Sequence, residues 1–489
     1  MSPSSAAPHE EAALVAGAPV SATLEKSSPP QLSRLATDAT SLRHTMLDGL
    51  KKVLGNPYDA KTNVNGILNL GTAENHLMFP ELLEKFNSDA IRKVSPSMLT
   101  YGTMYGSDHL RGNLQTRDAE ARSRESSRVG SESKRGVLLI GDHPLRSSNA
   151  LLKARLFNTY LKPAKDVTAD NITVHAGCGA TLSNVAQALT NPGEGILIPC
   201  PFYGGFEFDL TMYAQAKLIH VQTKSTDEFL VTVDALETAF KIAEDEGTHV
   251  SALLLTNPGN PLGLALSPST LLPLLQWAKR RNLHVISDEI YALSTFSESN
   301  PFVSVLSMPD LPDPDRTHVV WSFSKDFGSN GIRVGVFVSR NEPLLKAMHM
   351  FAVVTNASSL ADGATANLLD DQKWVAWYVK ENHKRMRSQC ERITVELRGM
   401  EIPFLQPDSA FFLFMDLSRY AKKIEAAHEG PAGEAWRTLW YKLLDAGVYI
   451  LPGEAFSCSE PGWYRIVFTV PWERISLGLE RLKKVLASI

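Results

Sequence analysis

The chain has 489 residues, of which 44% are hydrophobic and 21% charged, and its formal net charge is −4. This composition is ordinary for a soluble globular protein with large cores, and it excludes a fibre, a repeat array and a fully disordered chain. The slightly acidic charge gives no whole-chain attraction for nucleic acid or an anionic membrane surface. We therefore expect neither nucleic acid nor a membrane among its partners.

The four cysteines are scattered along the chain without a Cys-x-x-Cys pair. This spacing indicates neither a zinc site nor a disulfide framework, so we expect no metal and a reducing compartment. No apolar run approaches the roughly 18 to 20 residues of a membrane span. The first residues also lack the basic start of a secretory signal. Together these features predict a cytoplasmic protein.

The N-terminal residues divide into two parts. Residues 1–40 are rich in serine, alanine and proline without a hydrophobic period, which predicts a flexible leader. Residues 41–100 are expected to form an N-terminal segment that packs with a small domain. Within it the pattern predicts a short strand at 67–70 and a helix at 80–86.

Residues 116–150 form an atypical insertion. The tract mixes arginine, glutamate and serine without a hydrophobic period, and so long a structureless stretch inside a compact domain is unusual. It is either a solvated surface insertion or translated intron sequence in a gene model. Its removal would join 110–114 to 154–161 in one amphipathic helix. A mature transcript that retains these codons would refute the intron hypothesis.

Strands and helices alternate from about residue 171 to 340, which predicts a mainly parallel sheet covered on both faces. We assign 101–342 to this large α/β domain and 343–489 to a small C-terminal α+β domain. The predicted helices of the large domain are 182–189, 233–243 and 269–281. Its predicted strands are 172–175, 195–198, 217–221, 250–255, 284–287, 319–322 and 334–338, and those of the small domain are 411–415, 449–451 and 464–468.

Lys325 follows two serines in the run Ser322-Phe323-Ser324-Lys325 and precedes Arg333 by eight positions. A lysine forms a Schiff base with an aldehyde only when its amine is partly deprotonated. The two hydroxyls and Arg333 suit an aldehyde that carries a phosphate, such as pyridoxal 5′-phosphate. A solvated loop lysine is the alternative interpretation.

Ligands of open parallel sheets bind beyond the carboxyl ends of the strands. The run Gly179-Ala180-Thr181 begins a helix after the strand at 172–175, where backbone N–H groups can approach a phosphate. Packing of small residues is the alternative. The run Asn257-Pro258-Gly259-Asn260-Pro261 follows the strand at 250–255, and its two Asn-Pro turns leave amide side chains at the strand end.

Three further strand-end residues suit an aromatic cofactor. Asp288 can pair with a protonated pyridine nitrogen, and Tyr291 can bond a ring oxygen, although helix capping would also explain Asp288. Tyr203 can stack on a ring or belong to the core. Near the C-terminus, Arg465 interrupts an apolar strand. It can hold an α-carboxylate in a bidentate pair, or lie on a surface edge strand.

The chain resembles fold-type I pyridoxal phosphate enzymes of the class I/II aminotransferase superfamily. The matching motifs are Asn260-Pro261-Leu262-Gly263, Ser287-Asp288-Glu289-Ile290-Tyr291, the Lys325 run with Arg333, and Pro461-Gly462-Trp463-Tyr464-Arg465. The segment Asn69-Leu70-Gly71-Thr72-Ala73-Glu74-Asn75 resembles the branch of 1-aminocyclopropane-1-carboxylate synthase-like proteins. The resemblance extends from about residue 60 to the end, apart from the insertion.

This resemblance implies a role for each matching residue. Lys325 would hold pyridoxal phosphate as an internal aldimine and then move protons, with Asp288 at the pyridine nitrogen. Asn260 and Tyr291 would bond the ring oxygen, and Tyr203 would stack on the ring. The implied phosphate ligands are Gly179, Ala180, Thr181, Ser322 and Arg333. The implied substrate contacts are Ala73, Glu74 and Arg465, of which Arg465 would hold the carboxylate.

The resemblance also implies a homodimer, because the family uses a tyrosine from the neighbouring subunit to reach the phosphate. Tyr101 and Tyr105 both lie near Gly106, and we favour Tyr101.

The implied activity is removal of the α-proton from an α-amino acid. Transamination with a 2-oxo acid needs least beyond the shared machinery and is our first expectation. Elimination, as in carbon–sulfur lyases of fungal sulfur-metabolite pathways, and aminocyclopropanecarboxylate synthesis are the alternatives. A catalytically silent binding protein is an alternative of another class, and the intact Lys325, Asp288 and Arg333 count against it.

Overall fold

The computed structural model describes residues 32–33, 36–37, 45–114 and 156–489. The insertion at 116–150, with its intron hypothesis, lies outside these ranges, as does nearly all of the predicted leader. The described residues from 45 onwards, with their helices and strands, form one compact unit. The predicted domain boundary at 342 stays a prediction.

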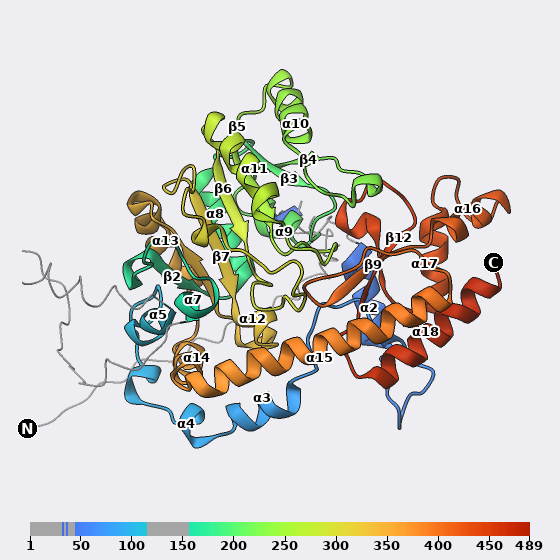
Figure 1. Cartoon of the computed structure of the whole chain (residues 1–489), viewed down its shortest axis with the longest axis horizontal. Coiled ribbons are helices and arrows are strands. Elements are labelled where there is room, and N and C mark those ends of the chain that lie inside the picture. Colours follow the sequence, from blue (N-terminus) through green and yellow to red (C-terminus); the bar gives the residue numbers. More distant parts are fainter. Residues whose placement is uncertain (1–31, 34–35, 38–44, 115–155) are drawn as a thin grey trace, which may run out of the picture. The chain divides into compact units, whose positions relative to one another are not determined.

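A seven-stranded sheet organises the described residues, in the order β2-β8-β7-β6-β5-β3-β4 (Figure 1). Neighbouring strands are parallel except around β8, which runs antiparallel to both β2 and β7. The predicted mainly parallel sheet is therefore confirmed. The strands are β2 (Ile172–His175), β3 (Gly195–Pro199), β4 (Lys217–Val221), β5 (Val250–Thr256), β6 (His284–Asp288), β7 (Thr317–Ser322) and β8 (Gly335–Val338).

The central strands are mostly apolar because both faces of the sheet are buried. On β5, Ala252 and Leu254 belong to one hydrophobic cluster, whereas Leu253 and Leu255 belong to the other. Alternate residues of a strand point to opposite faces, so a strand in this position favours apolar side chains on both of its faces. Helices cover the two faces: α8 (Cys178–Leu189), α10 (Val233–Asp245), α11 (Pro268–Arg280) and α13 (Glu342–Thr355) all contact the sheet.

Parallel pairing brings the strand-end residues to one edge of the sheet. Thr256 at the end of β5 is paired with Asp288 at the end of β6. Asp288 is in turn paired with Val320 of β7, two residues before Ser322. After Ser322 the short helix α12 (Phe323–Asp326) carries Lys325. The carboxyl edge therefore gathers residues that are far apart in the sequence, as predicted.

The C-terminal strands belong to separate small sheets. β9 (Phe412–Asp416), β12 (Trp463–Val467) and β11 (Leu451–Pro452) form an antiparallel sheet in which β12 is central. The single strand predicted at 449–451 is wrong, because β10 (Val448–Tyr449) pairs instead with β1 (Leu68–Asn69) in another sheet. Backbone partners so distant in sequence leave no local signal of where one strand ends and the next begins.

Long helices surround the C-terminal sheets. Figure 1 shows α15 (Gln372–Gly399) running from beside α14 (Ser359–Asp370) to the region of β9 and β12. The remaining C-terminal helices are α16 (Ser418–Ala426), α17 (Ala435–Asp445) and α18 (Trp472–Ala487). Among the described residues, no helix combines the length and the apolar character that a membrane crossing needs.

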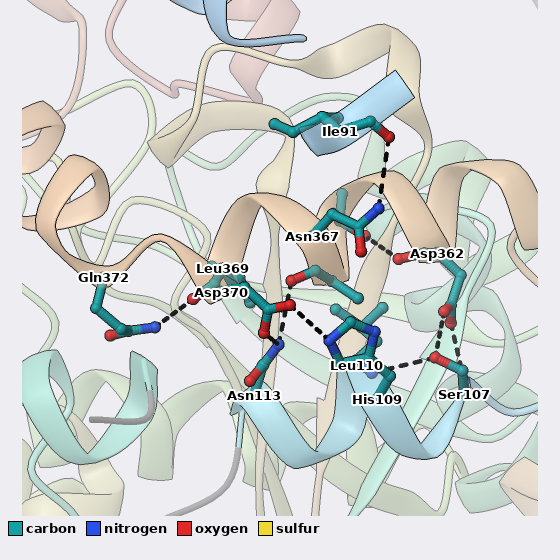
Figure 2. A network of polar contacts seen from close by, with 12 residues as sticks. Ile91, Ser107, His109, Leu110, Asn113, Asp362, Asn367, Leu369, Asp370 and Gln372 are labelled. Atoms are coloured by element: carbon teal, nitrogen blue, oxygen red, sulfur yellow. Dashed lines mark hydrogen bonds and ion pairs between the residues drawn. The ribbon is translucent and has the colours of Figure 1, made fainter. Parts of the chain in front are cut away.

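The N-terminal helices of the described region are α2 (Thr45–Gly55), α3 (Phe79–Phe86), α4 (Asp89–Arg92) and α5 (Asp108–Leu114), and α7 (Leu156–Tyr160) resumes the chain after the gap. Figure 2 shows α5 joined to α14 by polar contacts. His109 pairs with Asp370 at 3.0 Å, and the Asn113 amide donates to the same carboxylate. Just before α5, both the amide and the hydroxyl of Ser107 donate to Asp362.

Candidate active site

A cavity of about 430 Å³ lies at the carboxyl edge of the central sheet and extends to α2 and to the small sheets. Most of the predicted site residues come together in its wall, from segments spread over nearly 400 positions of the sequence. The predicted residues that line it are Ala73, Gly179, Tyr203, Asn260, Asp288, Tyr291, Lys325, Arg333 and Arg465.

Five predicted residues do not line this cavity. The Thr181 hydroxyl donates to the carbonyl of Gly177, and the Ser322 hydroxyl accepts from the backbone of Ser324, so both serve the local helix starts. Glu74 pairs with the ring of His76 at 2.9 Å. Ala180 follows Gly179 in α8, and Tyr101, 93% exposed, lies beside another pocket. Their predicted roles therefore stay predictions.

Lys325 has the chemistry that a covalent lysine needs. It is half-buried, and its Nζ atom donates to the carbonyl of Ala73 at 2.6 Å. Burial and the neighbouring Arg465 cation lower the pKa of Lys325 to about 8. A substantial fraction of the amine is consequently neutral and nucleophilic at mildly alkaline pH. The solvated loop lysine is the weaker interpretation.

Asp288 is a buried carboxyl that no cation of the described residues pairs with. It is 4% exposed, and its Oδ1 atom accepts from the backbone N–H of Ile290 at 3.3 Å. Burial raises the pKa of Asp288 to about 7. A cationic ring nitrogen placed beside it would restore the charged form, because an opposite charge favours ionisation. The carboxyl is thus suited to hold a pyridinium.

Tyr291 and Tyr203 contribute aromatic surface to the cavity. Tyr291 is 2% exposed and meets the rings of Phe411 and Phe412 edge-on. The Tyr203 ring lies so close to Gly205 that any side chain there would collide with it, and it meets Phe206 edge-on at 5.4 Å. Burial raises the pKa of Tyr203 to about 12, so both phenols are neutral donors at physiological pH.

One end of the cavity fits a phosphate. Gly177, at a φ of 91°, precedes α8, and a side chain there would collide with the Arg333 guanidinium. The glycine thus allows a cation to lie against the helix N-terminus, which itself favours anions. The Ser324 hydroxyl also lines the cavity, is buried, and has no hydrogen-bond partner within the described ranges. An orphaned donor, a cation and a glycine cradle together fit a bound phosphate.

Arg465 lies at the opposite side of the site, on the central strand β12. It is 2% exposed, so the alternative of a surface edge-strand arginine is wrong. Its Nη1 atom donates to Oδ1 of Asn260 at 2.8 Å, and its Nη2 atom donates to the carbonyl of Gly71. Its Nε atom has no partner among the described residues, which leaves donors for a carboxylate.

Sequence reasoning missed several residues of the cavity wall. Asp209, in the short helix α9 (Phe206–Thr211), lies with its carboxylate against Gly179, and burial raises its pKa to about 7. The sequence signal that could have identified Asp209 is its position in a helix that follows the end of a strand. Tyr449 and the α2 residues Met46, Leu47 and Leu50 also line the cavity. Nothing in their local pattern distinguishes them from core residues.

Asp326, the residue that follows Lys325, holds the helix of Lys325 in place. The buried carboxylate accepts hydrogen bonds from the Trp321 indole at 2.7 Å, from the Ser294 hydroxyl at 2.7 Å and from the Leu293 amide at 2.9 Å. Two of these donors belong to the turn that follows Tyr291. The interaction therefore ties the segment of Asp288 and Tyr291 to the helix of Lys325.

Residues 67–482 match the family model described as aminotransferase class I and II. The chain is 34% identical to mouse 1-aminocyclopropane-1-carboxylate synthase-like protein 1 over 88% of this chain and 78% of the relative. It is 33% identical to human "probable inactive 1-aminocyclopropane-1-carboxylate synthase-like protein 2", over 88% of this chain and 69% of that relative. It is 31% identical to rice 1-aminocyclopropane-1-carboxylate synthase 5, over 94% of this chain and 80% of that relative.

Solved structures share the fold. An aspartate aminotransferase from Rhizobium meliloti superimposes with a TM-score of 0.72 at 20% identity, over 94% of this chain and 99% of that one. The chain therefore belongs to the class I and II aminotransferases of fold type I, whose cofactor is pyridoxal 5′-phosphate, and within them to the 1-aminocyclopropane-1-carboxylate synthase-like branch.

Proposed function

We propose that this chain holds pyridoxal phosphate on Lys325 and acts on an α-amino acid as an aminotransferase. The observation that carries the proposal is that the Lys325 amine and the Arg465 guanidinium line one cavity, together with Arg333, whose guanidinium lies against Gly177. When bound, the cofactor supplies an electron sink that acidifies the Cα–H bond of the amino acid.

The residues of the chain have distinct tasks in this proposal. Arg465 binds the α-carboxylate, and its hydrogen bond to Asn260 fixes the plane of the guanidinium. Lys325, with its lowered pKa, is the base that accepts the α-proton and returns it. Asp288 holds the ring nitrogen in its protonated form. Arg333 and the Ser324 hydroxyl hold the phosphate.

Transamination is preferred because it needs only these groups and a 2-oxo acid as acceptor. Elimination from a substrate with a leaving group at Cβ or Cγ, including aminocyclopropanecarboxylate synthesis, uses the same groups and is the second candidate. The name of the rice relative favours that alternative. A silent binding protein is the third, supported by the name "probable inactive" of one human relative. Against it stand Lys325, Asp288 and Arg333, which are all present in the cavity wall.

The reaction type is tested by incubating the purified protein and cofactor with a panel of amino acids, with and without a 2-oxo acid. Formation of a keto acid only in the presence of the acceptor identifies transamination. A keto acid with ammonia and a released thiol, formed without acceptor, identifies a lyase. A protein that binds the cofactor but transforms no amino acid supports the silent alternative.

We also propose a homodimer. Tyr101 is 93% exposed, and Leu99, Val353 and Val354 are exposed apolar residues at 73%, 51% and 84%. Such exposure is typical of a surface that another protein covers. Tyr105 is instead stacked on His349 at 3.9 Å and lies under the Arg111 guanidinium, so it is committed within its own chain. Tyr101 is thus the better candidate to reach the phosphate of a partner subunit.

Four cysteines without disulfides agree with a cytoplasmic location.

A further inference from the structure

The cations in the wall of the active-site cavity are few. Among the described residues that line it, only Lys325, Arg333 and Arg465 carry a positive charge. The proposed function assigns Lys325 to the cofactor aldehyde, Arg333 to the cofactor phosphate and Arg465 to the substrate α-carboxylate. The described residues of this chain therefore offer no further cation to a second carboxylate on the substrate side chain, and Asp209 in the same wall adds a carboxyl.

Much of the wall that remains for the substrate side chain is apolar, beside the neutral polar residues Thr72 and Asn330. Helix α2 presents Met46, Leu47 and Leu50 to the cavity, and Leu451 of β11 lines it as well. None of these side chains can pair with a charge, and burial of a charged group against them is unfavourable. The acidic residue of this helix, Asp48, is more than half exposed and is not part of the wall.

Tyr449 fixes α2 in this position. Its ring lies between two glycines: a side chain on Gly49 of α2 would collide with it, and a Cβ on Gly71 would come within 2.7 Å of it. Its hydroxyl donates to the carbonyl of Met46 at 3.0 Å. Tyr449 also lines the cavity. Since Gly71 accepts a hydrogen bond from Arg465, the same ring joins the α2 wall to the side of the cavity that binds the carboxylate.

We infer that the substrate of this enzyme is an α-amino acid with a neutral, apolar side chain that packs against Met46, Leu47 and Leu50. The inference rests on the proposed function, because it takes Arg465 as the ligand of the α-carboxylate. A side chain of at least four heavy atoms, such as that of leucine, methionine or phenylalanine, suits this wall. Aspartate, glutamate and lysine do not.

The test uses the full chain loaded with pyridoxal phosphate and follows the near-ultraviolet and visible absorbance during titration with single amino acids. The expected result is saturation by leucine, methionine and phenylalanine at concentrations at least about 10-fold below those for aspartate, glutamate and lysine. Tighter saturation by a charged amino acid would overturn the inference but not the proposed function. No spectral change with any amino acid would overturn both.

Two matched variants test whether the α2 wall causes the preference for apolar side chains. Leu50→Ala removes wall contacts and is expected to weaken saturation by leucine about 10-fold while leaving alanine nearly unchanged. Leu54→Ala, at a position of the same helix that is 72% exposed and outside the wall, is expected to change neither. Equal loss for leucine and alanine in Leu50→Ala, or an equal effect of both variants, would overturn the assignment of α2.

Discussion

The Nζ atom of Lys325 donates to the carbonyl oxygen of Ala73 at 2.6 Å, which joins two residues 252 positions apart. The contact holds the amine in the cavity and links the central sheet to the N-terminal segment. A neutral amine can also donate this bond, so the contact is available to both forms of Lys325, and burial and the Arg465 cation still lower its pKa.

Capture of the cofactor by the apoprotein is expected to depend on pH. Because the pKa of Lys325 is lowered to about 8, the amine is mostly charged below that pH and mostly neutral above it. The initial rate of absorbance change after addition of pyridoxal phosphate should rise with pH and level off above pH 8. A rate that does not vary with pH would contradict this assignment, and Lys325→Ala is the control for non-covalent binding.

Replacement of Arg465 by lysine is expected to lower kcat/KM for the best amino acid roughly 30-fold or more, because a buried guanidinium binds a carboxylate through two parallel hydrogen bonds. Steady-state kinetics measures the loss, and cofactor content should stay unchanged. Arg280→Lys, at an exposed position, is the matched control. Wild-type kinetics in Arg465→Lys would remove Arg465 from the substrate site.

Replacement of Asp326 by alanine is expected to lower the free energy of unfolding by about 3 kcal/mol, because three buried donors lose their acceptor. Asp326→Asn should lose less, since its amide still accepts two bonds and can donate to the Ser294 hydroxyl. Urea unfolding measures both. Asp310→Ala, at an exposed site, is the control. A loss in Asp326→Ala no larger than that of the control would show that the three bonds contribute nothing.

The strands of the central sheet could be predicted because most of them are buried on both faces and contain short apolar runs. The same reasoning failed at 449–451, where β10 and β11 are two residues long and belong to different sheets. Among the site residues, Asp288, Asn260 and Lys325 could be predicted because parallel strands bring their carboxyl ends to one edge.

Residues that reach the site through tertiary packing could not be predicted. Tyr449 lines the cavity because Gly49 and Gly71 leave room for its ring. Leu47 and Leu50 of α2 line the cavity because Tyr449 holds that helix in place. The sequence pattern of α2 predicts only an amphipathic helix, and the same pattern would suit any packing partner. The Ser322 hydroxyl caps α12 and the Ser324 hydroxyl lines the cavity, while the phosphate role that the resemblance implies for Ser322 stays a prediction.

Replacement of Tyr101 by phenylalanine is expected to raise the Kd of pyridoxal phosphate about 10-fold, because a hydrogen bond to a charged phosphate is lost. Tyr105→Phe should change it little, since that ring is stacked within its own chain. Fluorescence titration of the apoprotein measures both. Analytical ultracentrifugation should show a dimer for the wild type and both variants. An effect confined to Tyr105→Phe would reverse the assignment.

The covalent role of Lys325 can be tested by borohydride reduction of the protein loaded with pyridoxal phosphate, followed by peptide mass spectrometry. We expect the reduced pyridoxyl group on the peptide that contains Lys325, and we expect Lys325→Ala to carry no such group at an equivalent site. A wild-type protein that binds no cofactor, or that carries it on another lysine, would contradict the proposed function.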